Sequence, residues 1–153
     1  MAKFILHFFG KKPSKDYLPL FENFQKRFPK SHELSIQYQH KYLHKDSSSQ
    51  QVKELLFIKE NIQKKGVHII LDERGKHFTS TEFASFIQQK HSLGRIHFYL
   101  GDANGFHNDI FELNILTLSL STFTLTHEIA RLVLLEQIYR AYTINIGHPY
   151  HNE

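Results

Sequence analysis

The stretch ILTLSLSTFTLTH, Ile115 to His127, runs directly into EIARLVLLEQIYRAYTINIGHPYH, Glu128 to His151. The first part opens with alternating apolar and polar residues, the period of a strand, and the second is apolar at helical spacing. These patterns predict a strand over Ile115–Leu120, a loop, and one long helix over Thr126–Tyr142. Chain ends are usually polar and loosely held. A tail HPYH, His148 to His151, after an apolar helix therefore indicates a functional terminus.

The predicted final helix is apolar on more than one side. One side carries Ile129, Leu132 and Val133, and another carries Leu134, Leu135, Ile138 and Tyr142. A helix that packs on a sheet needs a narrower apolar stripe, so part of this surface is expected to contact a second copy in a homodimer. Burial of the whole helix inside one domain is the alternative interpretation.

Upstream, short apolar runs alternate with stretches of helical period. This alternation predicts an α/β fold with a mainly parallel sheet flanked by helices, in a single domain over residues 1–153. Strands are expected at Phe4–Phe9, Leu34–Tyr38 with Tyr42 as a further alternating position, Val67–Leu71 and Arg95–Leu100. Helices are expected from Ser14 or Asp16 to Phe28, at Val52–Lys65, at Ser80–Lys90 and at Asn108–Leu113. Gly66 is expected as the C′ residue of the second, and a capping box of Thr79 and Glu82 marks the start of the third. Polar loops are expected over 44–51 and 72–78.

Composition excludes several classes of protein. The chain has no cysteine, which rules out disulfides, thiolate nucleophiles and cysteine zinc sites. No run of ~18 apolar residues could cross a membrane, and the N-terminal MAKFILHFFGKK lacks the pattern of a signal peptide. A soluble, cytoplasmic protein is expected.

Charge is distributed unevenly along the chain. Residues 1–50 carry nine basic against four acidic residues, 51–100 eight against five, and 101–153 two against six, giving +5, +3 and −4. A basic first two-thirds suits phosphate contacts with nucleic acid, although ordinary surface solubility would explain so modest a charge equally well.

The loops after Leu71, Leu100 and Leu120 are the expected ligand site, because open parallel sheets bind ligands beyond the carboxyl ends of their strands. The segment ERGKH is not a phosphate loop, since Ile70 and His77 stand where that motif needs glycine and a hydroxyl residue. The segment GDANG lacks the three spaced glycines of a dinucleotide site.

Twelve histidines raise the question of a metal site. The pairs His40 with His44 and His148 with His151 have usable spacings, but neither has an evident third ligand, and no HExxH motif exists. No metal is expected. Covalent catalysis is not expected either, because the chain has neither cysteine nor a GxSxG elbow.

Four segments carry a specific pattern: LDERGK (Leu71–Lys76), YLGDANGF (Tyr99–Phe106), LSLSTFTLTHEIARLVLLEQIYRA (Leu118–Ala141) and the tail HPYH. Together they closely resemble the RlmH family, which are ribosomal large-subunit RNA pseudouridine-N3 methyltransferases of the SPOUT superfamily. The first 60 residues match that family only in pattern. The resemblance implies S-adenosyl-L-methionine as cofactor, 23S ribosomal RNA in the assembled ribosome as substrate, a homodimer, and a C-terminal trefoil knot that the general rule against knots would not predict.

The resemblance also implies a cofactor site formed mostly by backbone groups. Its residues are Leu71, Gly101, Leu120, Ser121, Thr122, Phe123, Thr124 and Leu125. A flat apolar slot with backbone donors and acceptors suits an adenine, and glycine permits close approach of a ligand. Leu71, Leu120 and Leu125 could alternatively be plain core residues.

The catalytic residues that the resemblance implies are Arg140, His148, Tyr150 and His151, with one subunit's tail completing the other subunit's pocket. Arg140 is expected to hold a phosphate or base carbonyl, Tyr150 to order the target base, and His151 or His148 to assist removal of the N3 proton. For Arg140 the alternative is an ion pair with Glu136 at i,i+4.

Three positions depart from the family pattern. Asp102 stands where a second glycine is common, and its side chain would either repel the cofactor's carboxylate or change the backbone angles of the loop, which leaves cofactor affinity an open question. Thr122 and Phe123 replace other side chains without removing a backbone contact. A noncatalytic ribosome- or RNA-binding dimer, or a SPOUT methyltransferase with another RNA target, therefore remain alternatives. The candidate RNA-facing residues are Lys11, Lys12, Lys15, Lys26, Arg27 and Lys30.

Overall fold

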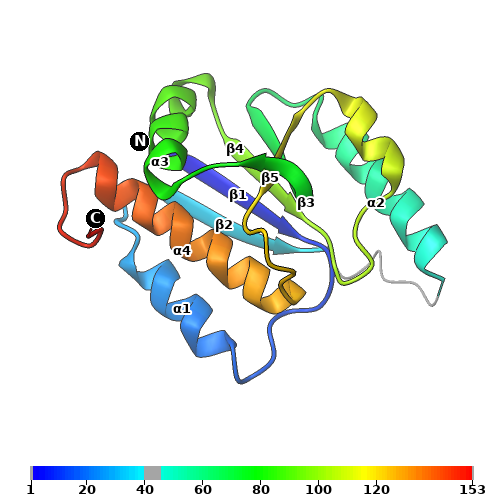
Figure 1. The fold of residues 1–153 in the computed structure, drawn as a ribbon, viewed down its shortest axis with the longest axis horizontal. Coiled ribbons are helices and arrows are strands. Elements are labelled where there is room, and N and C mark those ends of the chain that lie inside the picture. Colours follow the sequence, from blue (N-terminus) through cyan, green and yellow to red (C-terminus); the bar gives the residue numbers. More distant parts are fainter. Residues whose placement is uncertain (1, 40–45, 153) are drawn as a thin grey trace.

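A five-stranded sheet forms the centre of the molecule in a computed structural model that describes residues 2–39 and 46–152. The strands are β1 (Lys3–Phe8), β2 (Glu33–Tyr38), β3 (Val67–His77), β4 (Ile96–Leu100) and β5 (Leu116–Ser119), in the order β2-β1-β4-β3-β5. Every neighbouring pair is parallel, which confirms the predicted fold class (Figure 1).

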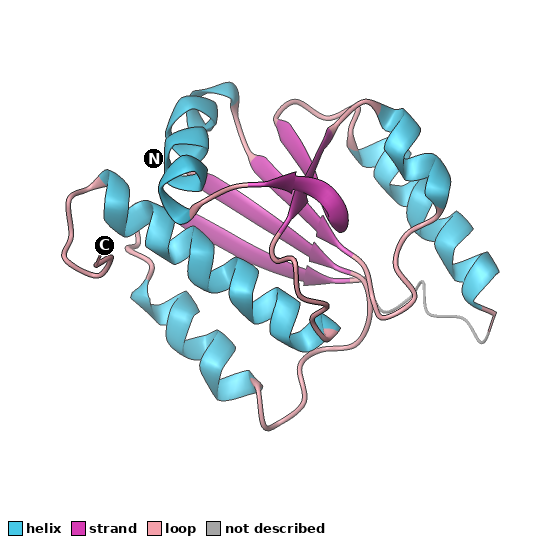
Figure 2. Cartoon of the chain, viewed as in Figure 1, coloured by secondary structure: helices cyan, strands magenta, loops and turns pink. Residues whose placement is uncertain are grey.

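Helices cover both faces of this sheet. They are α1 (Leu18–Arg27), α2 (Ser47–Asn61), α3 (Ser80–Lys90) and α4 (His127–Asn145), with the 3-10 turns η2 (His91–Leu93) and η3 (Asn108–Leu113). Helices α1, α3 and α4 lie on one face, and α2 with η3 lies on the other (Figure 2). The two faces therefore bury separate cores.

Strand β4 shows why the two cores differ. All five of its residues are buried. Because side chains alternate along a strand, Ile96, Phe98 and Leu100 join the core under α1, α3 and α4, while Tyr99 joins the core under α2. The α2 face also buries three polar rings that contact one another, those of His7, His68 and His97.

The start of α2 differs from the sequence prediction. Residues 47–51, expected in a loop, form its first turn because the Asp46 carboxylate accepts hydrogen bonds from the backbone N–H groups of Ser48 and Ser49. The helix ends at Asn61, so Gly66 is not its C′ residue. Gly66 has φ 139° and lies against the backbone of Arg95 instead.

The loop predicted after Leu71 is also wrong, because β3 continues to His77. Its pairing with β5 shifts register between Leu71 and Lys76, and the strand then pairs Lys76 with Leu118. A Cβ on Gly75 would lie 2.6 Å from the backbone of Thr117, so only glycine fits there. This β-bulge carries residues 72–75 beyond the regular pairing.

The remaining predicted elements are confirmed to within a few residues. The Thr79/Glu82 capping box is present at the start of α3, the short helix over Asn108–Leu113 is a 3-10 helix, and α4 extends to Asn145. Tyr42 and the histidine pair His40 and His44 lie outside the described residues. Among the described residues, no helix is long and apolar enough to cross a membrane. The trefoil knot stays a prediction.

Candidate functional site

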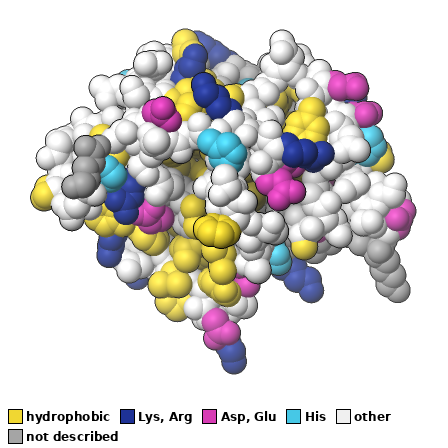
Figure 3. Space-filling view, viewed as in Figure 1, with side chains coloured by type: hydrophobic (Ala, Val, Ile, Leu, Met, Phe, Trp, Pro, Cys, Tyr) yellow, Lys and Arg dark blue, Asp and Glu magenta, His cyan; other side chains and the backbone are white. Residues whose placement is uncertain are grey.

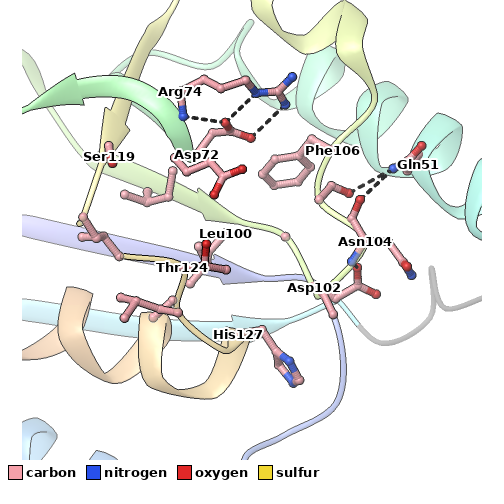
Figure 4. Close-up of a pocket in the computed structure, with 18 of the residues that line it drawn as sticks. Gln51, Asp72, Arg74, Leu100, Asp102, Asn104, Phe106, Ser119, Thr124 and His127 are labelled. Atoms are coloured by element: carbon pink, nitrogen blue, oxygen red, sulfur yellow. Dashed lines mark hydrogen bonds and ion pairs between the residues drawn. The ribbon is translucent and has the colours of Figure 1, made fainter. Parts of the chain in front are cut away.

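A cavity of about 590 Å³ opens between the bulged part of β3, from Leu71 to Arg74, and the loops that follow β4 and β5. The sequence predicts a ligand site in the segments after Leu71, Leu100 and Leu120, and all three segments line this cavity, although the first is part of β3 and not a loop. The start of α4 closes one side with His127, and α2 contributes Ser48 and Gln51 on another (Figure 4).

Seven of the eight residues predicted to bind a cofactor line this cavity. They are Leu71, Gly101, Leu120, Ser121, Phe123, Thr124 and Leu125; Thr122 is not among the lining residues. The loop that carries five of them is held by local hydrogen bonds: the Ser121 hydroxyl accepts from the Phe123 N–H at 2.9 Å, and the Ser119 hydroxyl donates to the Ser121 carbonyl at 3.0 Å.

The glycine-bearing loop after β4 forms the opposite wall. A Cβ on Gly101 would lie 3.4 Å from the Phe106 ring, so the loop is packed closely at that point. Its turn is closed by Asp102, whose Oδ1 accepts from the Asn104 N–H at 2.9 Å, and Gln51 on α2 donates to the Asn104 carbonyl at 3.0 Å. Helix α2 therefore tethers this loop (Figure 4).

Asp102 also joins a buried polar network. Its Oδ2 accepts from the Gln50 amide at 2.5 Å, and the same amide nitrogen lies 3.3 Å from Oε2 of Glu54. Glu54 is fully buried, and Oε1 of its carboxyl has no hydrogen-bond partner. Burial, together with the charge of Asp102, raises the pKa of Glu54 to about 7.

The β3 bulge brings an ion pair to the rim. Arg74 donates through Nε and Nη2 to the two carboxylate oxygens of Asp72, at 2.9 and 3.1 Å (Figure 4). Burial alone would raise the pKa of Asp72, but the hydrogen bonds and charge of Arg74 lower it below its usual value. The Arg74 guanidinium also stacks over the Phe111 ring at 4.2 Å.

The four residues predicted to be catalytic come together at the far end of α4. Arg140 donates to Oε1 of Glu136 through Nη2 at 2.6 Å and Nε at 3.0 Å, and stacks over the Tyr150 ring at 4.8 Å. The Tyr150 hydroxyl donates to the same Glu136 oxygen at 3.1 Å. Burial and this hydrogen bond raise the pKa of Tyr150. The tail is therefore packed onto the helix rather than loose.

Hydrogen bonds fix the tautomers of both tail histidines. Arg140 Nη1 lies 3.0 Å from Nδ1 of His151, and because a guanidinium only donates, that nitrogen must accept. His148 Nδ1 likewise accepts from the Tyr150 N–H at 3.2 Å. In their neutral forms both rings therefore carry the proton on Nε2.

The cavity and the tail cluster are separate within one chain. The cavity reaches His127 and Ala130 at the start of α4, and none of the four tail residues lines it. Arg140 lies ten residues beyond Ala130, which is about 15 Å along a helix. One chain alone does not bring the two predicted sets together.

Several residues at these sites carry no clear signal in the sequence. Asp72 and Arg74 lie within the predicted ligand loop after Leu71, which was the signal that could have found them, and Glu136 is visible only as the i,i+4 partner of Arg140. Gln50 and Gln51 fall in a segment that the sequence assigns to a loop, so their contribution depends on the tertiary fold. Within residues 2–39 and 46–152, no cluster of three or more His, Asp or Glu side chains could hold a metal ion.

Comparison with known proteins identifies relatives. A family model described as "Predicted SPOUT methyltransferase" matches residues 2–151. Ribosomal RNA large subunit methyltransferase H of Campylobacter lari is 47% identical over 91 residues, 60% of this chain and 58% of that protein. The protein of the same name from Prochlorococcus marinus strain NATL1A is 45% identical over 109 residues, 71% of this chain and 73% of that protein. The match thus spans less than two-thirds of the Campylobacter relative.

A solved structure shares the fold at low sequence identity. It is a protein of Legionella pneumophila, described as a methyltransferase and solved with bound SAM. The TM-score is 0.50 at 14% identity, covering 92% of this chain and 66% of the other. This likeness concerns the fold alone.

Proposed function

The chain belongs to the SPOUT methyltransferase family, and from this premise we propose that it methylates N3 of a pseudouridine in large-subunit ribosomal RNA, using S-adenosylmethionine, on the assembled ribosome. The observation that carries the proposal is the cavity between the β3 bulge and the loops after β4 and β5, with seven predicted cofactor residues on its walls. The names of the relatives from Campylobacter and Prochlorococcus support the choice of substrate. Action on ribosomes would place the enzyme in the cytoplasm.

The cavity suits the proposed cofactor. Its volume of about 590 Å³ lies within the range of small-molecule sites, ~300–1,000 Å³. Leu71, Leu100 and Phe106 give apolar walls for a purine ring, and Gly101 and Gly105 leave backbone groups accessible. Both carboxylate oxygens of Asp102 accept hydrogen bonds from the protein. Asp102 is thereby kept in a protein network, so the repulsion predicted from its charge is reduced.

When bound, S-adenosylmethionine supplies a methyl group activated by a positively charged sulfur. Methyl transfer to N3 of the base would break the carbon–sulfur bond of the cofactor and would require a base to accept the N3 proton. The protein's part is to align the two reactants and receive that proton. Arg140 is proposed to hold a phosphate or base carbonyl, for which it would have to release Glu136 or His151, and Tyr150 is proposed to order the target base.

The active site is proposed to be shared between two subunits. The separation of the tail cluster from the cavity within one chain supports this arrangement, since a second copy could bring its own tail to the pocket. Exposed apolar side chains support a dimer face: Leu18 and Leu20 on α1, Phe123 before α4, and Ile129 on α4. Figure 3 shows hydrophobic side chains gathered on this face over α1 and α4.

Proton removal by a tail histidine requires a rearrangement. The Nδ1 atoms of His148 and His151 already accept hydrogen bonds, and their Nε2 atoms carry the proton in the neutral rings. A histidine base would therefore have to release its partner, Arg140 or the Tyr150 N–H, when RNA binds.

Labelled methyl transfer to ribosomes that lack the modification tests the proposal, followed by mass spectrometry of the digested RNA. New N3-methylpseudouridine is expected. A methyl group elsewhere would favour another RNA target, and no transfer by a folded protein that fails to bind the cofactor in calorimetry would favour a noncatalytic RNA-binding dimer.

Mixed dimers test the shared site. Gly101→Val should block the cavity and Arg140→Ala should remove a tail residue, each abolishing activity alone. Mixing the two should restore activity, because the mixed dimer holds one intact pocket facing one intact tail. If the two variants stay inactive after they are refolded together, although mass spectrometry shows that mixed dimers have formed, the proposal of a shared active site is wrong.

A further inference from the structure

The end of α1 presents basic side chains that the proposed chemistry does not use. Lys26 and Arg27 occupy its last turn and Lys30 follows shortly after, and all three are exposed. Within the described ranges 2–39 and 46–152, none of them forms an ion pair. Cations here complement the helix dipole by only ~0.3–1 kcal/mol. The helix dipole therefore explains why these side chains are positively charged, but it does not explain how the Arg27 side chain is held.

Arg27 is held against aromatic rings of the tail cluster. Its guanidinium carbon lies 5.4 Å from the centroid of Phe24 and 5.8 Å from that of Tyr139, and its Nε donates to Asn23 at 3.2 Å. Tyr139 in turn packs edge to face on Tyr150 at 5.0 Å. Because stacking fixes the guanidinium plane, its terminal N–H groups are oriented without using their hydrogen-bonding capacity.

These contacts link two guanidinium groups through two rings: Arg27 lies over the buried Tyr139, Tyr139 packs on Tyr150, and Arg140 lies over Tyr150. Arg140 is neutralised by Glu136 at 2.6 Å. Arg27 is exposed and has no carboxylate partner among the described residues. Basic side chains are visible over the end of α1, beside the apolar face (Figure 3).

We infer that Arg27, flanked by Lys26 and Lys30, binds a backbone phosphate of the RNA substrate next to the target nucleotide. This inference rests on the proposed function and adds a substrate-positioning residue to it. Guanidinium groups match phosphate oxygens with two parallel N–H bonds. Phosphate contacts fix the position of a nucleic acid on a protein without reading its base sequence. A contact of this kind would hold the RNA backbone in place while Tyr150 orders the target base.

The test compares Arg27→Ala and Arg27→Lys with the control Lys90→Ala. Lys90 also ends a helix and lies over a ring of its own helix, Phe86 at 6.0 Å. With methyl-deficient ribosomes, Arg27→Ala should raise KM about tenfold and change kcat less than threefold. In a separate assay of binding to an RNA fragment, the slope of the log binding constant against the log salt concentration should fall in magnitude by about 1. Arg27→Lys should recover much of the affinity, and cofactor binding should not change.

The outcomes separate this inference from the proposed function. If wild type fails to methylate but Arg27→Ala still reduces the salt slope of RNA binding, the phosphate site stands and the methylation proposal falls. If wild type methylates and Arg27→Ala matches Lys90→Ala in both KM and salt slope, the phosphate site is wrong. Equal thermal unfolding of the variants excludes misfolding as the cause.

Discussion

The side-chain amide of Gln50 lies 2.5 Å from Oδ2 of Asp102 and joins that pocket residue to the buried carboxyl of Glu54, 3.3 Å from the same nitrogen. One amide thus serves two acidic groups, one at the cavity wall and one fully buried. Helix α2 is in this way part of the site, although Gln50 precedes Asp102 by 52 residues.

Gln50→Ala should destabilise the protein by ~1–3 kcal/mol, because it leaves buried acceptors without a donor. It should also weaken cofactor binding, since the loop after β4 loses the contact of Asp102 with α2 and keeps only those made by Gln51. Urea unfolding and calorimetry measure the two effects. Gln51→Ala is the matched control: that amide bonds only to exposed or partly exposed carbonyls of the same loop, so a smaller loss is expected. Equal losses in both variants would contradict the role assigned to Gln50.

Glu54→Gln should stabilise the protein at alkaline pH. The pKa of Glu54 is raised from 4.5 to about 7 in the folded state, so folding favours the protonated carboxyl. That contribution is complete below pH 4.5 and is lost as pH rises through 7. The free energy of unfolding of Glu54→Gln relative to wild type should therefore rise by up to about 3 kcal/mol from pH 4.5 to 8. Exposed Glu60→Gln should show a flat difference over the same range.

His7→Gln should reduce acid sensitivity. The pKa of His7 is lowered from 6.5 to about 3 by burial and the neighbouring rings of His97 and His68. Folding therefore favours the neutral ring, and stability is lost as pH falls below 6.5. Between pH 7.5 and 5, wild type should lose about 2 kcal/mol more than His7→Gln. The exposed His77→Gln variant, followed by the same urea titrations, should behave like wild type.

Gly75→Ala should disrupt the β-bulge. The new Cβ would lie 2.6 Å from Thr117 and 2.7 Å from Leu118, both backbone contacts that cannot rotate away. A loss of ~1–3 kcal/mol is expected, with weaker cofactor binding because the bulge carries the pocket residues Asp72 and Arg74. Exposed Glu73→Ala on the same bulge should change stability by less than about 0.5 kcal/mol. Wild-type stability in Gly75→Ala would refute this account.

Arg140→Lys should lower kcat by about tenfold or more without changing cofactor affinity. A lysine cannot reproduce the planar guanidinium that contacts Glu136 and His151 together while stacking on Tyr150. Single-turnover methylation of ribosomes measures the chemical step. An unchanged rate would mean that Arg140 serves only as the ion-pair partner of Glu136.

Much of the architecture follows from local patterns in the sequence. Short apolar runs locate β1 and β4, period-2 spacing locates β2, helical spacing locates α4, and Thr79 with Glu82 marks the start of α3, because these signals depend only on neighbouring residues. Parallel strands run toward the same edge of a sheet, so the segments after Leu71, β4 and β5 converge there. Those facts place the pocket, and the resemblance supplied its lining residues.

Other features were decided only by tertiary structure. The extension of β3 to His77 depends on pairing with β5, some 40 residues away, and no local period reveals it. The contributions of Gln50, Gln51 and Glu54 arise because α2 packs beside the loop after β4. The ordered tail depends on Glu136, whose carboxylate accepts hydrogen bonds from both Arg140 and Tyr150. The Glu136–Arg140 contact is a local i,i+4 pair that the sequence shows, but the other deciding contacts join residues that share no sequence pattern. The sequence therefore specified the parts and their order, while packing and hydrogen bonding specified which distant parts meet.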